Sequence, residues 1–575
     1  MKGRPYLIAL FAVLAAGSLA AQQPDDKAKS RSAEKGILVE QVLGEIPNLR
    51  LAENRAGALA RTGVLVCKSD PKLAAEIFRS SVSDLLSAQS FAEADRKNPG
   101  PNQDLLNSQV TRPMILRMIA GCDAEFALQS LYKSRPTAVE RAFAIPADAP
   151  PKLNNISPAY STLAQNEINL EQLFMRLAAE QNPDSTIDLL KASLKKGLSA
   201  ETLSLLKRLN SKDPVAAAEM ADEVIGRLMQ TGFLSGNQPD RQAISLAGAI
   251  LAEFARNKTP TETPIKFDPA RVHSLLDRLV SFYVVNGKKY GYSSFRNILP
   301  AADKLSPSAA RQLRSLEATS RPTVPGSQDS EFSKLLSTNP NADTLLAYAR
   351  RASETNQRQA YFAAANKLAD AGEYDRALAI LNNTFSDETL ENAIGSLNWY
   401  YVHLLMNKGR YSEAEQLIEQ FGDNNRRAAT VELAKALFRK DPVGNKNYAV
   451  TLLDKVRAEL PARPETNFEM QQLVQLIVVY LDIEQSEGLR MFEPLIPLIN
   501  DLSDASAMMW TFQGMLYVKQ GEFMINQGFP YNLNLDPTIF RTMSQKDFDS
   551  TLKLVDGFNR REMRIWMKIN LAEAR

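Results

Sequence analysis

Two segments of this sequence share one pattern: Gly372-Glu373-Tyr374-Asp375-Arg376-Ala377 returns as Gly409-Arg410-Tyr411-Ser412-Glu413-Ala414, 37 residues further along. Each segment follows a stretch with apolar residues at helical spacing and opens another such stretch. Glycine supplies the backbone freedom of a turn. The aromatic residue fills the space between two helices, and the alanine marks their closest approach. The pattern therefore predicts two helix–turn–helix units.

A third copy of the pattern is predicted near the C-terminal end. Trp510-x-x-Gln513-Gly514-x-x-Tyr517 precedes Gly521-Glu522-Phe523, and Gly521 follows Gly409 by 112 residues, close to three periods. These segments resemble the tetratricopeptide repeat, whose 34-residue helix–turn–helix unit carries Trp, Leu-Gly, Tyr, Ala and an aromatic residue at set spacings. One helix pair cannot bury its apolar face alone, so the resemblance implies a stack of pairs with a concave surface.

The resemblance also implies which residues would contact a partner, because in this family the first helix of each unit usually lines the binding groove. In the two clearest units the implied groove residues are Phe362, Asn366, Asp370, Trp399, His403, Met406 and Asn407. Trp399 and Met406 have an alternative interpretation as core residues, since apolar side chains at helical spacing usually face the core. The sequence departs from the family at Val402, where a small residue is preferred, and at Asn526, where alanine is preferred.

The rest of the chain is also predicted to be helical. Apolar residues recur at helical spacing, and the alternating β-branched runs typical of strands are missing from the sequence. An acidic or amide residue before proline can cap a helix and start its first turn. Such joints are Asp70-Pro71, Asn182-Pro183, Asp213-Pro214, Asn339-Pro340 and Asp441-Pro442. We expect an all-α chain, an α-solenoid built as a right-handed superhelix of antiparallel helix pairs and resembling tetratricopeptide repeats in its C-terminal part.

Two proline-rich stretches interrupt the helical pattern. They lie at 259–269 and at 321–327, and the second is the better linker candidate. We therefore expect an N-terminal helical array over 22–258, a middle helical segment with proline-rich linkers over 259–330, and a C-terminal array over 331–575.

The first residues have the pattern of a secretory signal peptide. Two basic residues precede an apolar run over 6–14 and small residues over 15–21. We expect cleavage after Ala20 or Ala21 and an exported chain, periplasmic or extracellular. An uncleaved anchor is the weaker alternative, because the apolar run is shorter than the ~20 residues that span a bilayer. The longest later apolar stretch covers only 476–481, so no transmembrane segment is expected after removal of 1–21.

The charges of the chain nearly balance. It has 68 Lys and Arg against 66 Asp and Glu, a formal net charge of +2, with both signs interspersed. This distribution does not attract nucleic acid. The two cysteines, Cys67 and Cys122, can close a disulfide in an oxidising compartment. They can equally stay as buried thiols that act as small apolar side chains, and the sequence leaves both alternatives open.

The residues that most classes of enzyme require for catalysis are missing from this sequence. Only two histidines occur, His273 and His403, and no His/Cys cluster, glycine-rich dinucleotide motif or phosphate-binding loop is found. No cofactor or metal is therefore expected. Catalysis by two carboxylates is still compatible with the sequence, because such pairs have no fixed spacing along a chain. The candidate clusters are Glu219, Asp222 and Glu223, and Asp482, Glu484 and Glu487.

Two functions compete on these grounds. The favoured one is a scaffold without catalysis that binds a protein or peptide of unknown identity in the concave face of its solenoid. The alternative is an envelope glycan-processing enzyme, or the helical accessory of one, that uses two carboxylates in a cleft.

Overall fold

The computed structural model describes residues 29–94, 103–135, 139, 158–181, 198–235, 238–256, 264–290, 295–320, 329–513, 518–525 and 536–575. These residues are almost entirely helical, with two short β-hairpins. The chain divides into two compact units, which are described separately. Unit 1 comprises Met1–Asn48 and Val324–Arg575, and unit 2 comprises Leu49–Thr323.

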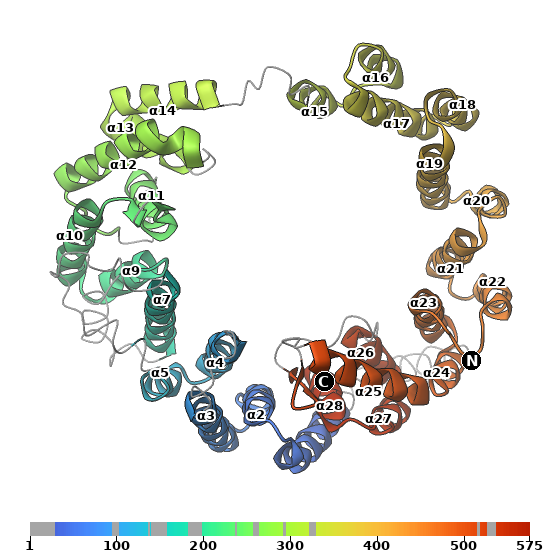
Figure 1. Ribbon diagram of the computed structural model, residues 1–575, viewed down its shortest axis with the longest axis horizontal. Helices are drawn as coiled ribbons and strands as arrows, with labels where there is room; N and C mark the ends of the chain where they lie inside the picture. The colour runs from blue at the N-terminus through green and yellow to red at the C-terminus, as the bar shows by residue number, and fades with distance from the viewer. Residues whose placement is uncertain are drawn as a thin grey trace, which may run out of the picture. The chain divides into compact units, whose positions relative to one another are not determined.

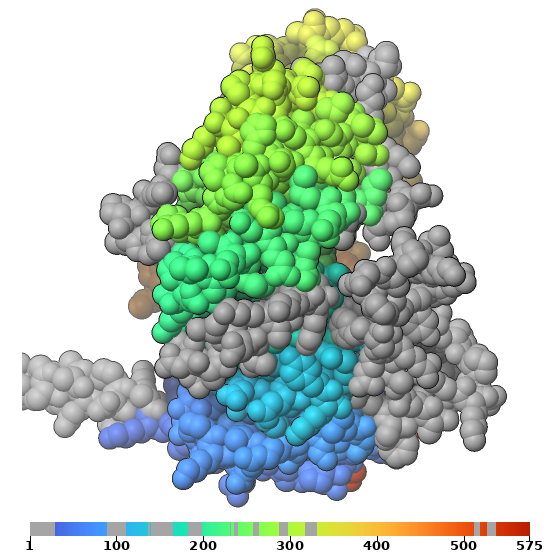
Figure 2. Space-filling view, turned by 90° about the vertical axis from the view of Figure 1, so that its left-hand side faces the viewer, coloured from blue at the N-terminus to red at the C-terminus, as the bar shows by residue number. Residues whose placement is uncertain are grey.

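Unit 2 is a sequential stack of helices (Figure 1). Its elements are α2 (Ala52–Val66), α3 (Pro71–Ala94), α4 (Gln103–Ala120), α5 (Ala124–Lys133), α7 (Pro158–Gln181), α9 (Thr202–Lys212), α10 (Pro214–Thr231), β1 (Leu234–Ser235), β2 (Gln238–Pro239), α11 (Arg241–Ala255), α12 (Pro269–Tyr290), η4 (Phe295–Ile298), α13 (Leu299–Leu305) and α14 (Pro307–Ser320). Several helices contact both the next helix and the one after it, as α2 contacts α3 and α4. Figure 2 shows the surface of this unit, where the colour passes in chain order from blue to green.

Unit 1 joins the C-terminal helices to the first described residues. Its elements are a helix over 29–45, η1 (Ile46–Asn48), α15 (Asp329–Ser337), α16 (Ala342–Ala349), α17 (Glu354–Asp370), α18 (Tyr374–Thr384), α19 (Asp387–Asn407), α20 (Tyr411–Ile418), α21 (Asp423–Lys440), α22 (Lys446–Glu459), α23 (Asn467–Ile483), α24 (Gln485–Phe492), α25 (Leu495–Gln513), β3 (Val518–Lys519), β4 (Glu522–Phe523), α26 (Pro537–Lys546), α27 (Phe548–Asp556) and α28 (Arg561–Glu573). From α17 to α23 the helices alternate between two layers, and α17, α19, α21 and α23 contact one another in sequence (Figure 1).

Aspartate caps explain where several helices begin. Asp70 accepts a hydrogen bond from the Leu73 N–H at 3.0 Å at the start of α3, and Asp213 accepts one from the Ala216 N–H at 3.0 Å at the start of α10. In both helices the following proline occupies the first turn, where its missing N–H is not needed. The predicted joint Asn182-Pro183 lies outside the described residues.

Two other predicted joints are wrong in position. Asn339 has a positive φ of 51°, and α16 begins only after Asn341, whose side chain accepts from the Thr344 N–H at 2.9 Å. Asp441 ends α21, and its carboxylate accepts N–H groups of the turn that precedes Lys446. Short polar side chains cap turns as readily as helices, so the pair of residue types does not fix the register.

The two glycine turns of the repeat share one backbone geometry. Gly372 has φ 86° and Gly409 has φ 75°, and each ends a first helix in a Schellman motif. In both, the glycine N–H and the N–H after it donate to carbonyls of the last helical turn. A residue with a Cβ is strained at such φ, so the turn itself requires glycine.

The alanine and the tyrosine of the pattern pack between helices, the alanine in the core and the tyrosine against the next unit. Ala377 and Ala414 have no exposed surface. Tyr374 stacks on Tyr401 of the next first helix, with ring centroids 4.6 Å apart, and its hydroxyl donates to Asn398. The predicted all-α helical solenoid is confirmed.

The predicted third copy of the repeat is wrong. Gln520 and Gly521, with φ of 51° and 75°, form the turn of an antiparallel hairpin between β3 and β4. Two consecutive positive φ values are those of a type I′ hairpin turn, which also favours glycine. A glycine before an aromatic residue therefore serves two different turns in this chain.

Residues 29–48 belong to unit 1, which contradicts their assignment to an N-terminal array over 22–258. Glu45 lies 3.2 Å from Arg564 Nε and 2.7 Å from Lys568 Nζ of α28, and Glu34 lies 2.9 Å from Arg575 Nε. Glu45 and Lys568 are 523 residues apart in the chain. No local pattern reports a contact of that separation.

The unit boundary falls at Thr323–Val324, inside the stretch 321–327 that the sequence marks as a linker. The expected boundary at 259 does not separate two units, because α12 packs against α10 and α11. The predicted signal peptide, 1–21, lies outside the described residues. Across the part of the chain that is described, no helix is long and apolar enough to cross a membrane.

Candidate partner-binding surface

Three of the predicted groove residues lie on one face of α19. Trp399 and His403 are one turn apart and meet edge to face, with ring centroids 5.2 Å apart. Both are partly exposed, and Asn407, one turn further along, is exposed. Residues four apart on a helix share a face, so this stripe continues along the first helix of its unit.

The other first helix, α17, carries Phe362, Asn366 and Asp370 at the same spacing, all partly buried. Phe362 packs against the core cluster between α17, α18 and α19. Asn366 Oδ1 is buried and has no hydrogen-bond partner among the described residues. Its amide therefore retains hydrogen-bonding capacity that the protein does not use.

Asp370 links α17 to α19 and is not a free carboxylate. It accepts a hydrogen bond from the Tyr400 hydroxyl, and its backbone carbonyl accepts from Lys408 Nζ at 3.2 Å. This hydrogen bond to Asp370, with partial burial, raises the pKa of Tyr400 to about 12. Asp370 therefore connects two first helices through groups that the protein itself already engages.

Met406 is a core residue, so its assignment to the groove is wrong. Its side chain is only 7% exposed, and Val402, one turn earlier on the same face of α19, is only 1% exposed. Both side chains are buried, whereas His403 is partly exposed and Asn407 is exposed.

The sequence analysis missed one charged residue of this layer, Arg427 on α21. Its Nε donates to Gln472 Oε1 of α23 at 3.1 Å, and its other nitrogen donates to Asn424 Oδ1 at 2.6 Å. Within residues 329–513, Arg427 alone among the partly buried Arg and Lys side chains has no carboxylate within 4.0 Å. The repeat is irregular here, so no spacing points to it.

Five of the six carboxylates in the acidic clusters that the enzyme alternative needs lie within 4.0 Å of a cation. Asp482 lies 3.1 Å from Lys546 Nζ, and Glu487 lies 2.6 Å from an Arg490 nitrogen. The hydrogen bonds of Arg490 and Arg457 hold the pKa of Glu487 below its usual range. Glu223 lies 2.7 Å from Arg227, and Glu484 and Asp222 each lie 3.9 Å from a cation. Glu219 is exposed on α10. Such pairs are typical of a solvated helix surface, and none of them favours glycan cleavage.

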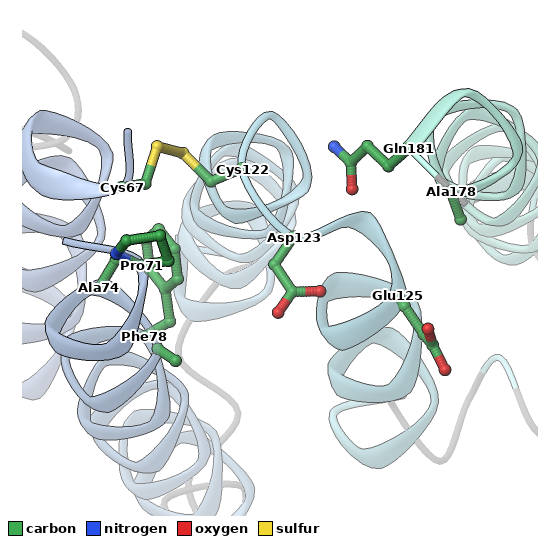
Figure 3. A pocket seen from close by; sticks show the side chains of 10 residues that line it. Cys67, Pro71, Ala74, Phe78, Cys122, Asp123, Glu125, Ala178 and Gln181 are labelled. Atoms are coloured by element: carbon green, nitrogen blue, oxygen red, sulfur yellow. A yellow bond between two sulfur atoms is a disulfide. The ribbon is translucent and has the colours of Figure 1, made fainter. Parts of the chain in front are cut away.

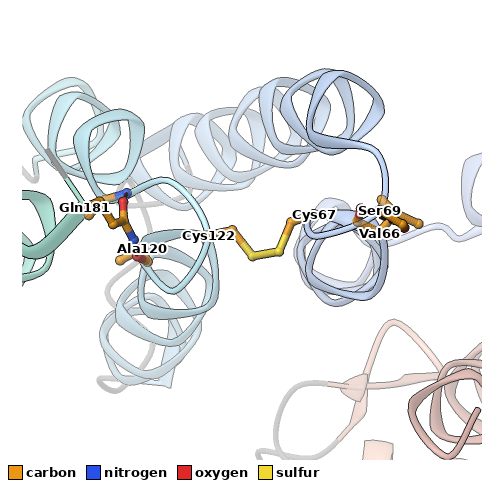
Figure 4. The surroundings of a disulfide bond; sticks show 7 residues. Val66, Cys67, Ser69, Ala120, Cys122 and Gln181 are labelled. Carbon is orange, nitrogen blue, oxygen red and sulfur yellow. Dashed lines mark hydrogen bonds between the residues drawn. A yellow bond between two sulfur atoms is a disulfide. The ribbon is translucent and has the colours of Figure 1, made fainter.

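In unit 2, Cys67 and Cys122 form a disulfide with a Cα–Cα distance of 6.1 Å (Figure 4). Cys67 is the C-terminal cap of α2, and Cys122 lies in the turn between α4 and α5. The bridge therefore joins two successive helix pairs, and the alternative of two free thiols does not describe this structure. Among the described residues, no group of three or more His, Cys, Asp or Glu side chains could hold a metal ion.

The comparisons with known proteins assign no family. No protein-family model matches the chain, and no curated protein matches it. Among solved structures, it is similar to a circular tandem repeat protein with novel repeat topology and enhanced subunit contact surfaces. That match has 13% identity and a TM-score of 0.15, and covers 94% of this chain and 96% of the other. A match this distant carries no argument about function.

Proposed function

We propose that this chain is an exported scaffold that binds a protein or peptide partner through the first helices of its C-terminal array. We name the binding surface the first-helix face and define it by Asn366, Trp399, His403 and Asn407. The observation that carries the proposal is the partly exposed Trp399–His403 pair, aligned with an exposed amide on a layer of contacting first helices.

The chemistry of this face suits a peptide better than a charged small molecule. Trp and His rings offer flat apolar area with a polar edge, which is the type of surface enriched at binding hot spots. Asn amides both donate and accept hydrogen bonds, as a peptide backbone does. Arg427, whose guanidinium is held by amide oxygens and has no carboxylate partner within residues 329–513, adds one cation on the same layer.

We also propose that the units around Gly372 and Gly409 are tetratricopeptide-like. The Schellman glycines, the buried alanines after them and the stacking of Tyr374 on the next first helix support this assignment. Export is proposed from the sequence of residues 1–21, and a disulfide in the folded chain suits an oxidising compartment. Mass spectrometry of the secreted protein tests the export. An N-terminus at residue 21 or 22 supports it, and one at Met1 contradicts it.

Site-specific photocrosslinking tests the first-helix face. A photoreactive phenylalanine analogue at position 396 should form adducts with the partner in cells, since Ser396 is exposed on α19 two turns before His403 and is not one of the residues that define the face. The same analogue at Asn382, which is exposed on α18 in the other layer, is the matched control and should form none.

A pair of alanine variants separates binding from folding. His403→Ala with Asn407→Ala should abolish the adducts of a crosslinker at position 396 and leave the melting temperature nearly unchanged, because substitutions outside the core typically cost within about 0.5 kcal/mol. Asn382→Ala with Asn383→Ala should change neither. Equal adducts from positions 396 and 382, or a much lower melting temperature for the first pair, would contradict the proposal.

A further inference from the structure

A hollow of about 220 Å³ lies beside the disulfide of unit 2 (Figure 3). Its apolar wall consists of the disulfide, Pro71, Ala74 and Phe78, and the two carboxylates that line it belong to Asp123 and Glu125. Figure 3 shows the apolar wall on the α3 side and the two acidic side chains on the α5 side. The hollow is thus apolar along one wall and negatively charged along the other.

The two carboxylates are available to a ligand. Asp123 uses one oxygen, Oδ1, to accept from the Phe126 N–H at 2.9 Å as the N-terminal cap of α5. Glu125 is exposed, and neither carboxylate forms an ion pair within the described part of the chain. None of the residues that line the hollow is Lys, Arg or His. A cation placed here would therefore meet two formal negative charges and no positive one.

The helix ends around the hollow are satisfied by groups of the protein itself. Three helices, α2, α4 and α7, end beside it, and the carbonyl groups of a helix C-terminus carry partial negative charge. Two helices, α3 and α5, begin there, but Asp70 and Asp123 already cap their N–H groups. The negative ends are satisfied as well, because the Ala120 carbonyl accepts from Gln181 Nε2 at 3.0 Å and the Ala179 carbonyl accepts from an Arg208 nitrogen at 2.9 Å. The charge of the hollow therefore comes from Asp123 and Glu125.

The volume limits what can enter. Pockets for drug-sized ligands typically measure ~300–1,000 Å³, so a hollow of about 220 Å³ admits roughly one side chain. Long basic side chains place an apolar stem against apolar surface and keep their charged end among polar groups. This shape and charge match the wall of Pro71 and Ala74 and the carboxylates opposite.

We propose that this hollow binds one lysine or arginine side chain of a protein partner. The alkyl stem lies along Pro71, Ala74 and the disulfide, and the charged end meets Asp123 and Glu125. The site belongs to unit 2 and does not depend on the first-helix face, so each can fail without the other.

The test uses the full-length oxidised protein with alanine methyl groups labelled for NMR. The probes are Nα-acetyl-lysine methylamide and Nα-acetyl-arginine methylamide, with the uncharged Nα-acetyl-norleucine methylamide as control. The cationic probes should shift the methyl signals of Ala74, Ala75 and Ala178 saturably, and the control probe should not. Equal shifts with the norleucine probe, or no saturable shift with the cationic ones, would overturn the proposal.

Variants identify the groups responsible. Asp123→Asn with Glu125→Gln removes both charges and keeps the helix cap, because asparagine caps as well as aspartate. This variant should bind the cationic probes at least fivefold more weakly, with an unchanged melting temperature. Ala75→Leu should abolish binding by filling the hollow, without any change of charge. Unchanged affinity in both variants would overturn the site.

A comparison with putrescine distinguishes two kinds of ligand, a side chain of a protein partner and a free amine. If putrescine binds more tightly than both blocked amino acids, the site serves free diamines and the proposed protein partner is wrong. Tighter binding of the blocked lysine or arginine supports a side chain of a partner.

Discussion

Replacing Cys67 and Cys122 with serine should destabilise unit 2 and leave unit 1 unchanged. The bridge joins residues separated by 55 positions, so its loss frees a long loop in the unfolded chain. The entropy of closing a loop of that length corresponds to about 4 kcal/mol at 25 °C. Both cysteines are partly exposed, so water can reach the new hydroxyl groups and no further cost from buried polar atoms is expected.

This loss is large compared with the ~5–15 kcal/mol by which protein domains are usually stable. Hydrogen exchange followed by mass spectrometry measures it locally. Peptides from α2, α3, α4 and α5 should exchange faster in the double serine variant, while peptides from α17 to α23 exchange as in the parent. Reduction of the parent with dithiothreitol should reproduce the variant.

Two results would refute this reasoning. One is a free energy of unfolding for unit 2 that falls by less than about 1 kcal/mol, which would mean that the loop is already restricted in the unfolded chain. The other is an equal loss of protection in unit 1, which would mean that the two units unfold together.

Three further predictions concern the interior. Glu167→Gln should destabilise unit 2 by about 3–5 kcal/mol in urea unfolding, because it removes the charge that Arg112 and Arg135 share at 2.7 and 3.0 Å in the core. Ala414→Leu should lower the free energy of unfolding of unit 1 by about 1–3 kcal/mol, because this buried site has no room for a larger side chain. Burial, with Tyr401 and Asp375 nearby, raises the pKa of Tyr374 to about 12. The neutral hydroxyl of Tyr374 therefore contributes stability to unit 1 that is fully present below pH 10 and is lost as the pH rises from 10 to 12. In Tyr374→Phe, the decrease of unfolding free energy over this pH range, followed by circular dichroism, should be smaller than in the parent.

Each of these predictions has a control. Glu180→Gln removes an exposed ion pair with Arg176 and should cost less than about 1 kcal/mol. Ser412→Leu adds the same side chain at an exposed position of α20 and should be nearly neutral. For the tyrosine, identical alkaline slopes in parent and Tyr374→Phe would show that this hydroxyl does not set the pH dependence.

The helical content and several helix starts follow from the sequence because they rest on local interactions. An aspartate that caps α3 or α10 contacts N–H groups only three residues away, and the glycine of a Schellman turn satisfies carbonyls of the helix it ends. Such contacts leave a pattern within a few positions. The spacing of Trp399, His403 and Asn407 predicted their common face for the same reason.

Where the same residues were compatible with two local structures, only the tertiary structure decided between them. The glycine before an aromatic residue at 521 forms a hairpin, and Met406 turns to the core. The pairing of Cys67 with Cys122 and the docking of residues 29–48 on α28 depend on groups far apart in the chain. Packing and ion pairing depend on distances in space, whereas a sequence records only distances along the chain. The sequence therefore predicts the local turns of this protein but not the contacts between residues that are far apart in the chain.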